Sequence, residues 1–94
     1  MALETKVFDS ADYLHTSEEI AAYIEAAFED GEPAVITHAL GVVARAKGMS
    51  QLARDAGVTR EALYKALTAD GDPKLSTFIG VMKALGLRLT AQAA

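Results

Sequence analysis

The sequence predicts an all-α fold, with five helices in a single domain and short extended segments at both ends. Its 94 residues are enough for one small hydrophobic core. Alanine, the strongest helix former, occupies 19 positions, and only two residues are proline. Each segment with helical periodicity is also bounded by capping residues and stop signals, which favours separate helices.

The first expected helix is acidic and spans residues 16–31, after an N-terminal arm over residues 1–15. Thr16 and Glu19 have the spacing of a capping box, in which each side chain satisfies a backbone N–H of the other residue. Gly31 is placed to end the helix. The apolar residues follow at helical spacing: Ile20, Ile24, Ala27 and Phe28.

The second expected helix begins at Pro33, which suits a first helical turn, and ends before Gly48. A glycine inside a helix costs about 1 kcal/mol, so Gly41 predicts the close approach of a neighbouring segment. Apolar residues on most sides of this helix predict burial on most sides. They form two stripes: Ile36, Leu40 and Val43 in one, and Val35, Ala39, Val42 and Ala46 in the other.

Three further helices are expected over residues 49–56, 60–68 and 74–85, which complete a core of residues 33–86. For the last helix we expect Asp72 as the N-cap and Pro73 at the first helical position. Its predicted core stripe and stop are Leu75, Phe78, Met82, Leu85 and then Gly86. The alternation in residues 87–90 predicts a short terminal strand within the segment 87–94.

Residues 49–67 have the pattern of a helix-turn-helix. Ala53 is small enough for the crossing of two helices, and Gly57 suits the left-handed residue that ends the first of them. Thr59 can cap the second helix, while Leu63 and Leu67 hold that helix on the core. The turn of about three residues agrees with the motif.

The outward side of this pair of helices predicts DNA binding. Arg60 lies in the first turn of the second helix, where an arginine can make a bidentate contact with guanine in the major groove. Glu61 is an exception, because it repels phosphate unless it accepts from cytosine N4. The predicted DNA-binding residues are Ser50, Gln51, Thr59, Arg60, Glu61, Tyr64 and Lys65. The alternative is a helical hairpin with a solvated charged face.

Charge divides the chain into two parts. Residues 1–33 hold nine acidic side chains and one basic one, whereas residues 34–94 hold eight basic and four acidic ones. The formal charges are therefore −8 and +4, which suggests two surfaces with different partners. An ordinary domain beside a solvated acidic helix is the alternative.

Taken together, these residues resemble the lambda-repressor-like helix-turn-helix domains and, more closely, the HigA-like addiction-module antidotes, which are also described as prophage DNA-binding proteins. The resemblance covers about residues 6–89. The motifs that carry it are Phe8-Asp9-x-Ala11, Ala44-Arg45-Ala46-x-Gly48-Met49-Ser50-Gln51-x-Ala53 and Gly57-x-x-Arg60-Glu61-x-Leu63-Tyr64-x-Ala66-Leu67.

This resemblance implies a type II antitoxin that binds operator DNA, represses its own operon and neutralises a small RelE/HigB-like ribonuclease toxin. A toxin that holds RNA is expected to be basic, and the acidic part of the chain would attract it. Phe8, Tyr13 and Leu14 either anchor this partner or cover the core. The alternatives are a stand-alone prophage-type repressor without a toxin, and an interaction module whose helix-turn-helix no longer binds DNA.

A homodimer is expected, because one recognition helix reads too few base pairs for useful specificity. Leu87 and Leu89 are its expected contact surface. Without cysteine there is no disulfide or thiol nucleophile, and His15 and His38 lack further ligands nearby, so no metal site is expected. No nucleophile motif or phosphate loop predicts an enzyme or a cofactor, and no apolar run suggests a membrane span or signal, so we expect a cytoplasmic protein.

Overall fold

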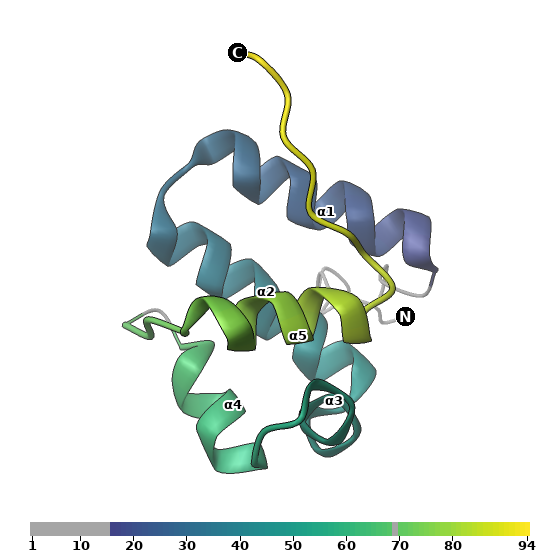
Figure 1. The fold of residues 1–94 in the computed structure, drawn as a ribbon, viewed down its shortest axis with the longest axis vertical. Helices are drawn as coiled ribbons and strands as arrows, with labels where there is room; N and C mark the ends of the chain where they lie inside the picture. Colours follow the sequence, from purple (N-terminus) through teal and green to yellow (C-terminus); the bar gives the residue numbers. More distant parts are fainter. Residues whose placement is uncertain (1–15, 69) are drawn as a thin grey trace, which may run out of the picture.

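The computed structural model describes residues 16–68 and 70–94, and all of their regular structure is helical. The helices are α1 (Ser17–Asp30), α2 (Pro33–Lys47), α3 (Met49–Ala56), α4 (Arg60–Ala66) and α5 (Leu75–Ala84) (Figure 1). These ranges contain no strand. The prediction of an all-α fold with five helices is therefore confirmed.

The ends of α1 follow the predicted local chemistry. Thr16 N donates to Glu19 Oε1 at 3.0 Å, and Glu19 N donates to Thr16 Oγ1 at 3.1 Å, which completes the capping box. Gly31 has a φ of 83°, in the left-handed region, and its N–H donates to the Ala27 carbonyl. The turn then leads into Pro33 at the start of α2.

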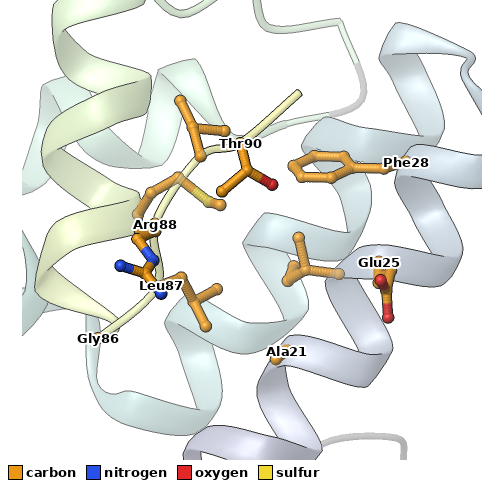
Figure 2. A pocket seen from close by; sticks show the side chains of 10 residues that line it. Ala21, Glu25, Phe28, Gly86, Leu87, Arg88 and Thr90 are labelled. Carbon is orange, nitrogen blue, oxygen red and sulfur yellow. The ribbon is translucent and has the colours of Figure 1, made fainter. Parts of the chain in front are cut away.

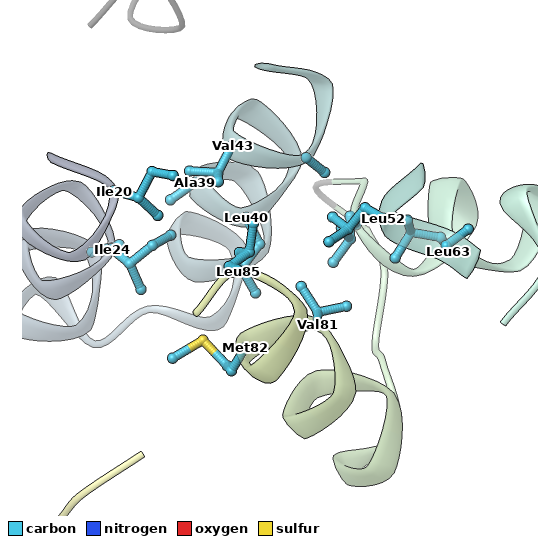
Figure 3. Packing of buried hydrophobic residues seen from close by; sticks show 14 residues of the cluster. Ile20, Ile24, Ala39, Leu40, Val43, Leu52, Leu63, Val81, Met82 and Leu85 are labelled. Atoms are coloured by element: carbon cyan, nitrogen blue, oxygen red, sulfur yellow. The ribbon is translucent and has the colours of Figure 1, made fainter. Parts of the chain in front are cut away.

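The core is formed where α1 packs on α2 and where α3 packs on both α4 and α5. Figure 3 shows its apolar side chains meeting between the helices. The polar side chain of Thr37 is buried among them, and its hydroxyl donates to the carbonyls of Pro33 and Ala34 at 3.2 Å. The largest fully buried side chains are Ile20, Ile24, Leu40, Val43, Leu63 and Val81.

Gly41, inside α2, lies where a neighbouring segment approaches closely, as predicted. A Cβ atom on Gly41 would lie 2.8 Å from the carbonyl oxygen of Leu67, so the end of α4 approaches α2 at this point. Burial of α2 on most sides was, however, a wrong expectation. Val35 is 41% exposed and Ala46 is also exposed, because α1 and α3, against which α2 packs, do not cover this side.

The start of α5 also differs from the prediction. Its N-cap is Lys74 rather than Asp72, and Pro73 precedes the helix instead of occupying its first position. Leu75, expected in the core stripe, is 70% exposed because it lies in the first turn, beyond the side that packs on α3. Val81 is fully buried in its place.

The chain after α5 lacks the expected terminal strand. Gly86 ends the helix with a φ of 79°, and Leu87 N donates to the Met82 carbonyl at 2.9 Å. Residues 87–94 then run without helix or strand across the α1 side of the molecule (Figure 1). A strand needs a neighbour with which its backbone can pair, and none lies beside this segment within the described residues.

Candidate nucleic-acid interface

The pair α3 and α4 is joined by a three-residue turn over residues 57–59. Gly57 has a φ of 79°, in the left-handed region, and its N–H donates to the Arg54 carbonyl at 3.2 Å. Val58 N donates to the Ala53 carbonyl at 3.0 Å. These bonds satisfy carbonyls at the end of α3 and turn the chain sharply into α4.

One side of this pair is fixed in the core. Leu52 and Ala53 of α3 are 3% and 2% exposed, and Leu63 of α4 has no exposed surface. Leu67, directly after α4, is 5% exposed, and the half-buried Val58 packs against the same core from the turn. Because α4 is held along one side only, its remaining side chains point to solvent.

The exposed side of α4 carries the predicted DNA-binding residues. Thr59 Oγ1 accepts from Ala62 N at 3.0 Å, so the predicted cap is present and Arg60 is the first helical residue. Tyr64 is 59% exposed, which leaves its ring and hydroxyl free for a ligand surface. The exposed set on this side is Thr59, Arg60, Glu61, Tyr64 and Lys65.

The start of α3 supplies the other two predicted residues, Ser50 and Gln51, and both are exposed. No side chain caps this helix, since its N-cap is Gly48. Backbone N–H groups in the first turn of a helix have no partner within the helix and suit a phosphate oxygen.

Gln51 makes side-chain hydrogen bonds within α3 that were not predicted from the sequence. Its Nε2 donates to Asp55 Oδ1 at 2.9 Å, and its Oε1 accepts from an Arg54 terminal nitrogen at 3.2 Å. One amide proton of Gln51 is left for an outside acceptor. The spacings of three and four residues are a signal by which these partners could have been found.

The charge of this surface is mixed rather than uniformly basic. Arg54, Arg60 and Lys65 are exposed, but so are the carboxylates of Asp55 and Glu61. Purely electrostatic binding to phosphate needs an excess of cations, which this pair of helices scarcely has. Recognition of DNA here would therefore depend on the positions of individual side chains more than on a net positive charge.

A hollow of about 690 Å³ lies between α4 and the segment that leads to α5. Lys65 and Lys74 line it, together with Asp70 and Asp72. Lys74 is exposed and was not among the predicted site residues, although a cation shortly after α4 is a readable signal.

Three further features concern the predicted partner-binding residues, metal ligands and membrane-spanning helices. Phe8, Tyr13 and Leu14, the predicted partner-binding residues, lie outside the described residues. Among residues 16–68 and 70–94, no group of three or more metal-ligating side chains comes together. None of the described helices combines the length and the apolar character that crossing a membrane requires.

Comparison with known proteins gives one family. The family model of a probable addiction module antidote protein matches residues 4–93. An uncharacterized protein of Haemophilus influenzae is 46% identical over 92 residues, which cover 98% of this chain and 95% of that protein. No solved structure gives a significant match.

The match extends over nearly the whole chain, including all five helices. An antidote acts by binding a toxin, so this family implies a toxin partner and suggests a regulatory protein rather than an enzyme. The chain belongs to the family of probable addiction module antidote proteins.

Proposed function

We propose that this antidote is also a sequence-specific DNA-binding protein, which represses its own operon and neutralises a small RelE/HigB-like ribonuclease toxin. In this proposal α3 and α4 act as a lambda-repressor-like helix-turn-helix, with α4 in the major groove. The observation that supports it most is the exposed side of α4, where Arg60, Tyr64 and Lys65 stand outward while Leu63 is fully buried.

Each residue has a role in this arrangement. Arg60, in the first turn of α4, can donate two hydrogen bonds to guanine O6 and N7. Tyr64 and Lys65, one turn later, suit a base edge or a phosphate oxygen. Ser50 and the remaining amide proton of Gln51 contact phosphate at the start of α3, which fixes the register of α4 on the duplex.

The test is Arg60→Ala in a titration of the protein against DNA from its own promoter. We expect a loss of about 1–3 kcal/mol in binding free energy and relaxed preference at one base pair. The thermal midpoint should not change, because Arg60 is exposed. Lys47→Ala is the matched control, since it removes one exposed positive charge outside α3 and α4. Equal affinity of Arg60→Ala and the unchanged protein would show that α4 does not read the sequence.

The toxin surface is proposed to lie in the acidic part of the chain, with Phe8, Tyr13 and Leu14 as apolar anchors. Residues 1–33 carry a formal charge of −8, which repels DNA and attracts a protein that holds RNA.

Deletion of residues 1–14 tests this assignment. We expect the truncated protein to lose toxin affinity while it keeps its operator affinity and its thermal midpoint. Equal loss of both affinities together with a lowered midpoint would mean that the arm completes the core. Unchanged toxin affinity would transfer the role to the exposed glutamates of α1.

A homodimer is the remaining part of the proposal. One α4 reaches only a few base pairs, and two copies on a two-fold axis would read two half-sites about 34–36 Å apart. A footprint with two protected half-sites at this spacing is expected; a single unpaired half-site would contradict a dimer.

A further inference from the structure

Hollows lie on both sides of the segment that follows α5, and apolar and charged side chains line both of them. The larger, of about 320 Å³, lies between this segment and α1, and the smaller, of about 280 Å³, lies between it and α5. Met82, Leu87 and Leu89 line both of them. We name the two hollows together with residues 87–90 the tail groove.

The walls of the tail groove differ in charge. Figure 2 shows Ala21, Glu25 and Phe28 of α1 on one wall and Leu87, Arg88 and Thr90 on the other. One wall therefore carries an exposed carboxylate and the other an exposed guanidinium, with apolar side chains between them.

The segment also presents groups that have no partner in the part of the chain that the structure describes. Leu89, at the rim of both hollows, is 43% exposed, so an apolar side chain projects from the same surface as the recess. Within the described residues, no backbone hydrogen bond joins residues 88–94 to any other segment. An extended segment with free N–H and C=O groups is a template for pairing with another extended segment.

We propose that the tail groove is the surface through which two copies of this chain associate, an inference that deepens the homodimer of the proposed function. In a two-fold interface the same patch meets itself, so it must be complementary to itself. Here the Leu89 knob of one copy enters the recess of the other, and Arg88 of each copy faces Glu25 of the other. Residues 87–90 of the two copies run antiparallel and satisfy each other's backbone groups.

The choice of a second copy rests on charge. A basic toxin would complement the α1 wall but would meet Arg88 and Lys83 along the rest of the groove, at a cost in repulsion. A second copy sets its Arg88 against the Glu25 wall and its Glu25 against the Arg88 wall, so both of these charges meet one of opposite sign. Figure 1 places the C-terminal segment at the opposite end of the molecule from α4, so this contact leaves both α4 helices uncovered.

Charge reversal between two chains tests the proposal without DNA or toxin, so its outcome is independent of the rest of the proposed function. Arg88→Glu alone sets two carboxylates against each other, and Glu25→Arg alone sets two guanidinium groups against each other. We expect each variant by itself to raise the dimer dissociation constant about tenfold or more, because each change occurs twice across the axis. A mixture of the two variants restores both attractive pairs and should give heterodimers in sedimentation velocity.

Only a contact between two chains predicts that mixing the variants restores the dimer. If Arg88 instead paired with Glu25 of its own chain, that pair would stay broken in each variant and in their mixture. Lys47→Glu is the control for a charge reversal elsewhere on the surface and should leave the dimer unchanged. Leu89→Asp, at an exposed site after the last helix, should give a folded monomer with the helical circular dichroism of the unchanged protein. A monomeric unchanged protein, a dimer that survives Leu89→Asp, or a mixture that stays monomeric would each overturn the proposal.

Discussion

Helices α1 and α4 begin in the same way and differ in what they present to solvent. Each follows a threonine whose hydroxyl accepts a backbone N–H: Thr16 from Glu19 at 3.1 Å, and Thr59 from Ala62 at 3.0 Å. Each also buries one apolar side in the same core. The local rules that make these two segments helical are therefore nearly identical.

Their outward sides are of opposite sign. α1 exposes Glu18, Glu25 and Glu29, whereas α4 exposes Arg60 and Lys65 beside one acid, Glu61. The two helices lie toward opposite ends of the molecule (Figure 1). Capping and core residues thus specify that a helix forms, whereas the exposed residues contribute little to stability and are free to differ between the two helices.

The largest expected effect is a loss of stability when either helix loses a side chain from the core that α1 and α4 share. Leu63→Ala in α4 and Ile24→Ala in α1 should each lower the free energy of unfolding by about 2–5 kcal/mol, because each leaves a cavity at a buried site. Urea unfolding followed by circular dichroism measures this. A variant that unfolds in two steps would show that the two helices do not share one cooperative core.

A smaller effect, directed at α4, is expected from Gly41→Ala. Alanine gains about 1 kcal/mol in helix propensity, but its Cβ would lie 2.8 Å from the Leu67 carbonyl oxygen, which is backbone and cannot rotate away. We expect a net loss of about 1–3 kcal/mol in stability and weaker DNA binding, as the end of α4 is displaced. Increased stability with unchanged DNA affinity would contradict this.

The two caps give a closer comparison. Thr16→Ala and Thr59→Ala should each cost about 0.5–2 kcal/mol of stability, whereas the Thr→Ser variants retain the hydroxyl and serve as controls. Only Thr59→Ala should also weaken operator binding, because that cap fixes the first turn of α4. An equal effect of both alanine variants on DNA affinity would remove the distinction between the helices.

The smallest effect is expected at Glu61, the exposed acid on the basic side of α4. Glu61→Gln should strengthen DNA binding by about 0.5 kcal/mol at low salt and by less at high salt, since it removes repulsion from phosphate. Titrations at two salt concentrations measure the change. Weaker binding confined to one base pair would instead assign Glu61 to cytosine N4.

The sequence by itself determined where most helices begin and end. Thr16, Gly31, Gly57 and Thr59 act through bonds to residues within a turn of the chain, so their effect is readable without knowledge of the fold. The outward side of α4 could also be predicted from the sequence. Leu63 and Leu67 are spaced so that both face the core, which leaves Arg60 and its neighbours exposed.

Only the tertiary structure decided which apolar stripes are buried. Leu75 and Val35 have the periodicity of core residues but are exposed, while Val81 is fully buried, because burial depends on where neighbouring helices end. Gly80 was unforeseen for the same reason: a Cβ there would lie 3.0 Å from the Ala56 carbonyl oxygen. The tail groove likewise exists only because the chain after Gly86 returns across α1, a path that no local signal specifies.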